Sequence, residues 1–389
     1  MKILRFLFIA TLASSLIACG TKTKKTDFFG VEEKSKKPKV ENTTSLKRNW
    51  RAKVGDNIDA GDAIISPSLF GESLYAAAPN GRIEKIDAST GKTQWQVKLK
   101  KEVITGGVGV GGGLVLVGTD QGIVYAFNQS DGSLSWKVEL SSEILASPVY
   151  GSEVVIARTG DGKVFGLAAF DGEVIWTIGR QLPRLTLRGD SRPLVNQGVA
   201  FVGFPDGTLV ALDAKNGRAL WDLPISFPRG TNEIERLSDI DTTPLLVGGN
   251  IYVSSYQEIT HSLDIAEQKI AWSIDVSSFN SLGFDAAFLY ISDREGVVHQ
   301  IDRDTGEKVW SQTGLRTFTT SAPISIGPYV MVTDSDGTAF VMDKNDGSYV
   351  GRHSLGARTI VGDPIVDSDT IYFIDSSGNL QSMSLTGSS

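Results

Sequence analysis

Tryptophan recurs along the chain at a nearly constant interval, and this spacing limits the possible folds more than any other feature. The intervals run from 38 to 51 residues, and the flanking sequence repeats with them, as in NGRIEKIDASTGKTQW, DGTLVALDAKNGRALW and EGVVHQIDRDTGEKVW. A repeat of about forty residues indicates an array of similar supersecondary units. The seven tryptophans are Trp50, Trp95, Trp136, Trp176, Trp221, Trp272 and Trp310.

Each unit has the pattern of four short β-strands. In residues 146–178, four alternating apolar runs are separated by Gly-Ser, Gly-Asp-Gly and Asp-Gly, and such turns use the positive φ angles that Gly, Asn and Asp adopt at low cost. Four antiparallel strands repeated at this interval are typical of a β-propeller blade. The tryptophan falls in the fourth, outermost strand, where its ring can pack between neighbouring blades. We expect this packing role rather than the stacking of a cofactor.

The two ends of the repeat region complement each other. Residues 46–54 read as a fourth strand with no strands before it, whereas residues 359–385 contain three strand-like runs and no fourth. Joined, they complete an eighth blade and leave no open sheet edge in the ring. We therefore predict an all-β fold for residues 46–389: an eight-bladed β-propeller of four-stranded antiparallel blades, closed by the N-terminal strand.

Two copies of the repeat are degenerate. The copy that ends at Trp272 lacks both repeat glycines, and Gly351 stands where the seventh copy should carry tryptophan. We expect these departures to affect only the regularity of the blades.

The first residues have the anatomy of an export signal. Lys2 and Arg5 precede a mostly apolar stretch, which is too short and wrongly flanked for a membrane-spanning helix. The stretch ends in Leu-Ile-Ala-Cys and resembles the lipobox of bacterial lipoproteins, in which the peptide is cut before the cysteine and the cysteine is acylated. We therefore predict a signal peptide at residues 1–18 and lipidation of Cys19; the alternative is an ordinary signal peptide with a chance cysteine. Because Gly20 follows, rather than the Asp that resembles an inner-membrane retention signal, we expect the outer membrane.

Residues 19–45 differ in composition from the repeats that follow. Between Gly20 and Arg48 the chain carries nine Lys or Arg residues against four Asp or Glu, with few aliphatic residues, so we predict a flexible lipidated tether. The whole chain has a formal charge of −7, which argues against a nucleic-acid partner. Cys19 is the only cysteine, and this excludes disulfides and cysteine-based metal sites in the mature chain.

No group of residues in the sequence suggests a reaction. His261, His299 and His353 lie in different repeats without metal-ligand spacing. Aspartates recur mainly in turns, where bonding to the local backbone explains them. The glycine run at 106–113 lacks the Lys-Ser/Thr pair and the helix of a phosphate loop. We predict no catalytic residue, no metal site and no cofactor.

Two connections between repeats are irregular, and both join the outermost strand of one blade to the innermost strand of the next. In a propeller such connections emerge on one face, so we expect these two to be neighbours. Leucines beside arginine, with acidic residues nearby, have the make-up of a protein-binding hot spot. The alternative is that the leucines cap the central channel and Arg188 pairs internally with Asp239 or Asp241. Residues 182–191 present Arg184, Leu185, Leu187 and Arg188, and residues 224–244 present Glu233, Glu235, Asp239 and Asp241.

The lipobox, the eight-fold tryptophan repeat and these two connections together resemble the BamB family of outer-membrane assembly lipoproteins, across nearly the whole chain. The resemblance implies a non-enzymatic subunit of the β-barrel assembly machinery, lipid-anchored on the periplasmic side of the outer membrane. It implies binding to the periplasmic POTRA domains of BamA, and assistance to nascent outer-membrane proteins. The contact residues that it implies are Leu185, Leu187 and Arg188 in the first connection and Asp239 and Asp241 in the second.

A second hypothesis stays open, because the repeat also resembles that of quinone-dependent alcohol dehydrogenases. Under it, the chain is a periplasmic quinoprotein-like enzyme or a small-ligand-binding propeller. A bound quinone in the absorbance spectrum, or a central calcium in a metal assay, would favour this second hypothesis.

Overall fold

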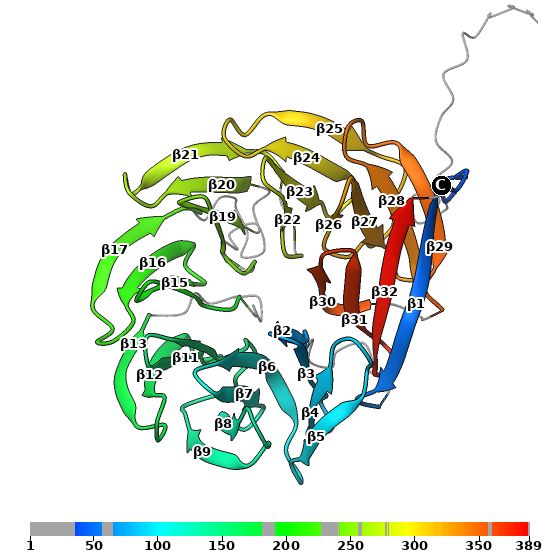
Figure 1. The fold of residues 1–389 in the computed structure, drawn as a ribbon. Coiled ribbons are helices and arrows are strands. Elements are labelled where there is room, and N and C mark those ends of the chain that lie inside the picture. Colours follow the sequence, from blue (N-terminus) through cyan, green and yellow to red (C-terminus); the bar gives the residue numbers. More distant parts are fainter. Residues whose placement is uncertain are drawn as a thin grey trace, which may run out of the picture. The chain divides into compact units, whose positions relative to one another are not determined.

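The computed structural model describes residues 36–56, 65–180, 191–226, 240, 242–255, 259–276, 278, 280–356 and 360–387. Within these residues all regular structure is β, and the strands form eight antiparallel sheets of four strands each. The sheets are arranged as blades around a central axis (Figure 1). The predicted eight-bladed β-propeller is confirmed.

Seven blades are built from four consecutive strands, and the eighth combines both ends of the chain. Blade 1 contains β2 (Ser68–Phe70), β3 (Ser73–Ala77), β4 (Arg82–Asp87) and β5 (Thr93–Lys98), and blade 2 contains β6 (Ile104–Gly111), β7 (Leu114–Thr119), β8 (Ile123–Asn128) and β9 (Leu134–Glu139). Blade 3 contains β10 (Val149–Gly151), β11 (Val154–Arg158), β12 (Lys163–Ala168) and β13 (Val174–Gly179), and blade 4 contains β14 (Leu194–Asn196), β15 (Val199–Gly203), β16 (Thr208–Asp213) and β17 (Ala219–Pro224). Blade 5 contains β18 (Leu245–Val247), β19 (Asn250–Ser255), β20 (Ile259–Asp264) and β21 (Lys269–Ile274), and blade 6 contains β22 (Gly283–Phe284), β23 (Phe288–Ser292), β24 (Val298–Asp302) and β25 (Lys308–Gln312). Blade 7 contains β26 (Ile324–Ile326), β27 (Tyr329–Thr333), β28 (Thr338–Asp343) and β29 (Tyr349–Ser354), and blade 8 contains β30 (Ile360–Asp367), β31 (Thr370–Asp375), β32 (Asn379–Gly387) and β1 (Thr44–Lys53).

The N-terminal strand closes the ring as the sequence predicts. β1 pairs antiparallel with β32, from Thr44 opposite Gly387 to Lys53 opposite Asn379. Figure 1 shows these two strands side by side, in blue and red. The strand begins at Thr44, two residues before the predicted start of the propeller. The reason is that the Thr43 amide donates to the Val350 carbonyl of blade 7 at 2.8 Å, which fixes the residues just before the strand.

Burial follows the position of a strand within its blade. Second strands such as β3 and β7 are buried along their whole length, whereas fourth strands such as β9 alternate. The inner strands have sheets packed on both faces, and a fourth strand is the outer edge of its blade. The apolar clusters are shared between neighbours: Leu116 and Trp136 of blade 2 pack with Val155 and Phe165 of blade 3.

The tryptophans pack between blades, as predicted. The Trp176 indole N–H donates to the Ala214 carbonyl in the third turn of blade 4 at 3.0 Å. Its ring covers Gly217 so closely that a Cβ atom there would lie 2.6 Å from it, and Gly217 has a φ of +71°. Only glycine meets both demands without strain. Five more tryptophans donate to the equivalent carbonyl of the next blade: Trp50 to Ala88, Trp95 to Gln129, Trp136 to Ala169, Trp272 to Arg303 and Trp310 to Lys344.

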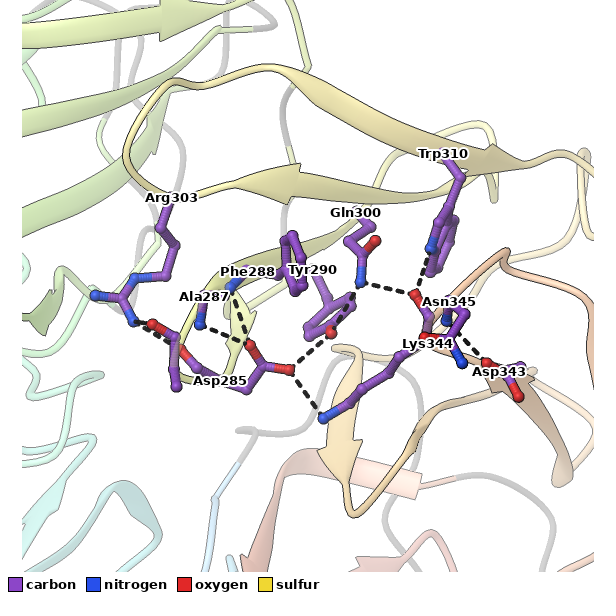
Figure 2. A network of polar contacts seen from close by, with 11 residues as sticks. Asp285, Ala287, Phe288, Tyr290, Gln300, Arg303, Trp310, Asp343, Lys344 and Asn345 are labelled. Carbon is purple, nitrogen blue, oxygen red and sulfur yellow. Dashed lines mark hydrogen bonds and ion pairs between the residues drawn. The ribbon is translucent and has the colours of Figure 1, made fainter.

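A polar network extends this contact between blades 6 and 7 (Figure 2). The Lys344 carbonyl accepts from both Trp310 and Gln300, at 2.9 and 3.0 Å. The Lys344 ammonium group lies 2.9 Å from an Asp285 carboxylate oxygen, which also accepts from the Tyr290 hydroxyl at 2.8 Å. The turn before β23 is thereby bound to the turn before β29, so the two blades are joined by charge as well as by apolar packing.

Gly351 occupies the place of a tryptophan because the next blade offers no turn to receive one. In blade 8 the third strand ends at Gly387 and the fourth begins at Thr44, so no chain connects them locally. The space is filled by Thr44, whose hydroxyl would lie 2.1 Å from a Cβ atom at Gly351. The Thr44 hydroxyl also bonds the His353 ring at 2.9 Å. The degenerate residue is therefore a consequence of how the ring closes.

Candidate functional site

Among the described residues, the fourth strands end and the first strands begin on one face of the ring, and we call it the connection face. The turns between second and third strands lie on the same face, because antiparallel strands alternate in direction. Hydrogen bonds join the two kinds of segment: the residue that follows a fourth strand donates its amide to the glycine of the turn between the second and third strands. Such pairs are Val54–Gly378, Leu99–Gly81, Leu140–Gly122, Arg180–Gly162, Ile225–Gly207 and Leu355–Gly337. The opposite face, with the other two kinds of turn, is called the hairpin face.

The two irregular connections start and end on the connection face. The first lies between Gly179, which ends β13, and Leu194, which begins β14; the second lies between Pro224, which ends β17, and Leu245, which begins β18. The predicted contact residues lie outside the described residues and stay predictions, as does Cys19. They are Leu185, Leu187, Arg188, Asp239 and Asp241.

The described ends of the two connections are bonded to each other. The Ser191 hydroxyl donates to the Thr242 carbonyl at 3.1 Å, and the Arg192 amide donates to the Thr243 hydroxyl at 3.4 Å. Ser191 and Thr242 are both buried. The expectation that the two connections are neighbours therefore holds at the residues where they enter blades 4 and 5.

The second connection is also anchored at its start. The Ile225 and Ser226 amides both donate to the Gly207 carbonyl, at 2.9 and 3.0 Å. Near its other end, Ile240 is buried in the cluster shared by blades 4 and 5 and packs over Gly203. Both ends of this connection are thus held by the blade cores.

Arg180 holds the start of the first connection. Its guanidinium lies 3.0 Å from an Asp206 carboxylate oxygen, also pairs with Asp222, and stacks over the Phe204 ring at 5.1 Å from the centroid. All three partners belong to blade 4, whereas Arg180 follows the last strand of blade 3. Sequence reasoning missed this residue, because its partners lie 24 to 42 positions away and only the blade contact brings them together.

The first strands of the blades surround a cavity of about 1180 Å³ along the axis. Arg192 from blade 4 and Asp363 from blade 8 are among its lining residues. Burial lowers the pKa of the Arg192 guanidinium, and the charge of Asp363 opposes that shift. Asp363 also accepts from the Ser281 hydroxyl at 2.7 Å. Most other lining residues are apolar or carry hydroxyl groups.

The histidines belong to the strand packing of the blades. His299 bonds Ser311, its cross-strand partner, at 2.8 Å and Asp293 at 2.9 Å. This order of groups resembles a catalytic triad, but the pair recurs in blade 5, where His261 bonds its own cross-strand serine at 2.8 Å. Asp293 also accepts two amides of its own turn. We therefore assign these contacts to the architecture of the blades.

In the part of the chain that the structure describes, no three His, Cys, Asp or Glu side chains are grouped closely enough to bind a metal ion. Over the same ranges, no helix has the length and apolar character needed to cross a membrane.

Comparison with known proteins points to one family. A family model described as outer membrane protein assembly factor BamB matches residues 79–312. The BamB of Yersinia pestis is 32% identical, over 88% of this chain and 90% of its own length. The BamB of Xanthomonas campestris is 31% identical, over 98% of this chain and 97% of its own length.

Solved structures agree in fold. The crystal structure of BamB from Moraxella catarrhalis superposes with a TM-score of 0.79 at 26% identity, covering 87% of this chain and all of that one. A quinohemoprotein alcohol dehydrogenase from Pseudomonas putida superposes with a TM-score of 0.67 at 12% identity, a likeness of fold alone. The family model and the extent of these alignments lead to one conclusion: the chain belongs to the BamB family of outer membrane protein assembly factors.

Proposed function

We propose that this chain is a non-enzymatic scaffold subunit of the outer-membrane β-barrel assembly machinery, which binds the POTRA domains of BamA and assists the folding and insertion of outer-membrane proteins. The observation that carries the proposal is the bond between Ser191 and Thr242, which ties together the ends of the two irregular connections. Because the chain belongs to a family of assembly factors, we infer that two long connections whose described ends are bonded to each other form a partner-binding surface.

The proposed contact surface combines apolar and charged groups. Leu185 and Leu187 supply apolar area, and Arg188 supplies a planar head with several donors that can orient the contact. Asp239 and Asp241, on the adjoining connection, either position Arg188 or meet basic groups of BamA. Such compact sets of apolar and arginine side chains commonly dominate binding energy.

The proposed anchor is Cys19, acylated after removal of residues 1–18. The protein would then lie on the periplasmic side of the outer membrane, held by the tether. Cys19→Ser should leave an uncleaved or soluble precursor that takes up no labelled palmitate. A palmitate-labelled product of normal size from this variant would contradict the anchor.

The binding surface is tested by co-purification with BamA from detergent-solubilised membranes. Leu187→Ala and Arg188→Ala should each weaken binding by about 1–3 kcal/mol, as truncated hot spots commonly do. Arg184→Ala, in the same connection but outside the proposed set, is the matched control and should bind normally. Melting curves of all three variants should match the parent chain. Full binding by Leu187→Ala and Arg188→Ala, or loss of binding through unfolding, would refute the assignment.

A further inference from the structure

We propose that residues 37–44, here called the latch segment, fasten the N-terminal tether to blade 7 so that the tether leaves the ring on the connection face. The latch segment leads into β1, with which it shares Thr44, and runs beside blade 7, whose strands lie about 300 positions later in the sequence. Its key residue is Lys37.

Lys37 enters a site built for a cation. Its ammonium group lies 2.5 Å from Asp334 and 2.8 Å from Asp336, both in the turn between β27 and β28, and 5.7 Å from the centre of the Phe318 ring. The Asp334 side chain is fully buried. Burial lowers the pKa of Lys37, but the bonds and charges of the two aspartates outweigh it and leave the pKa raised. An uncompensated carboxylate at Asp334 would be costly.

Equivalent turns in the neighbouring blades also pair the aspartate at this position with a basic side chain. In blade 6 the first residue of the turn is Asp293, and His299 of the same blade bonds it at 2.9 Å. In blade 8 the residue is Asp375, and Arg51 of the fourth strand lies 3.7 Å from it. In blade 7 the residue is Asp334, and the described partner of opposite charge is Lys37. The latch segment therefore supplies the basic side chain that blades 6 and 8 provide from their own strands.

The latch segment runs along β29, the outer strand of blade 7, from the connection face to the hairpin face. Lys37 contacts the turn before β28, which lies on the connection face. The Arg352 guanidinium then donates to the Pro38 carbonyl at 3.4 Å, and the Arg352 amide to the Asn42 side chain at 2.6 Å. Thr43 bonds Val350 at 2.8 Å, next to the last turn of blade 7 on the hairpin face. The chain then reverses and returns as β1.

This path decides where the tether departs. If all residues before Thr44 were free, the tether would leave the ring on the hairpin face. The 25 residues from Cys19 to Thr44 would then reach about 85 Å. With the latch closed it leaves at Lys37, after 18 residues and about 60 Å. If the proposed function holds, the membrane anchor and the partner then act on the same face of the ring. Such a constraint raises the effective concentration of an anchored protein at its partner.

Paired spin labels test the path directly. In the chain with Cys19→Ser, one nitroxide is attached through Lys36→Cys, and the second through either Gln121→Cys on the connection face or Ser130→Cys on the hairpin face of blade 2. The parent chain should give narrow distance distributions, with position 36 on the side of Gln121. Lys37→Ala and Asp334→Asn should broaden both distributions and shift position 36 by about 15 Å or more toward Ser130, since eight freed residues form a flexible chain. Lys37→Arg, which keeps the charge, and Lys39→Ala, an exposed neighbour, should change neither.

Unchanged distributions in Lys37→Ala, or a parent chain in which position 36 lies nearer Ser130, would overturn the proposal.

The consequence of the latch for BamA binding is measured separately. Lipid-anchored Lys37→Ala should capture severalfold less BamA in membranes, whereas the unanchored chain with Cys19→Ser should bind BamA equally with and without Lys37→Ala. A parent chain that does not bind BamA would refute the proposed function and leave the distance result standing; equal capture by both anchored chains would refute the link between latch and binding.

Discussion

At the residue scale, the Asp285 carboxylate illustrates how a single side chain joins two blades (Figure 2). Burial raises its pKa, but bonds from Lys344, Tyr290 and two backbone amides outweigh burial, so the pKa lies below the usual 3.8. A depressed pKa means stabilisation that is complete above about pH 4 and lost as the pH falls through the folded-state pKa.

Asp285→Asn should therefore lower the free energy of unfolding by about 2 kcal/mol at pH 7, and the difference from the parent should shrink below about pH 4. Urea unfolding midpoints across this pH range measure it. Asp304→Asn, an exposed aspartate of the same blade, should have no effect; an Asp285→Asn deficit that persists unchanged at pH 3 would contradict the ionic explanation.

At the element scale, the fourth-strand tryptophan of one blade packs on a positive-φ glycine in the last turn of the next blade. Blades 5 and 7 depart from this pattern. In blade 5, Gln268 stands where other blades have glycine, yet it keeps the positive φ, at +53°. In blade 7, restoring the repeat through Gly351→Trp should destabilise the protein, because the new side chain would meet Thr44 and His353. Overpacking of this kind costs about 1–3 kcal/mol, which melting curves can detect. Removing the obstructing hydroxyl with Thr44→Ala in the same chain should recover part of the loss. A stabilising Gly351→Trp would mean that the closure does not explain the missing tryptophan.

At the scale of the whole molecule, stability depends on β1 closing the ring. Deleting residues 44–53 removes the partner of β32 and also Trp50, whose indole donates to blade 1 at 2.9 Å. Trp50 is only partly buried, so its loss costs part of the about 3–5 kcal/mol that a fully buried aromatic contributes, and the deletion also exposes strand edges that promote aggregation. The deleted chain should melt far below the parent or aggregate, whereas deletion of residues 21–35 should leave the melting temperature nearly unchanged. Thermal scans of the two deletions side by side decide the matter, and coincident curves would refute closure by the N-terminal strand.

The sequence by itself determined the architecture of this protein. Strand number, turn positions, the place of tryptophan in the fourth strand and closure by the N-terminal strand all follow from local signals: apolar alternation, turn glycines and a fixed repeat length. These signals are carried within each unit of about forty residues, so each can be read without knowing what lies beside it. Contact residues such as Leu187 and Arg188 were inferred from the resemblance and from the irregularity of their connection, and they await the binding test.

Only the tertiary structure decided which distant residues meet. Lys37 pairs with Asp334, Arg180 pairs with Asp206, and Thr44 takes the place of a tryptophan ring at Gly351. No repeat or spacing marks these pairs, because the partners belong to different parts of the ring and, in two of the three pairs, lie about 300 positions apart. A charge in a sequence shows neither its burial nor its neighbours, and both depend on how the closed ring brings the blades together.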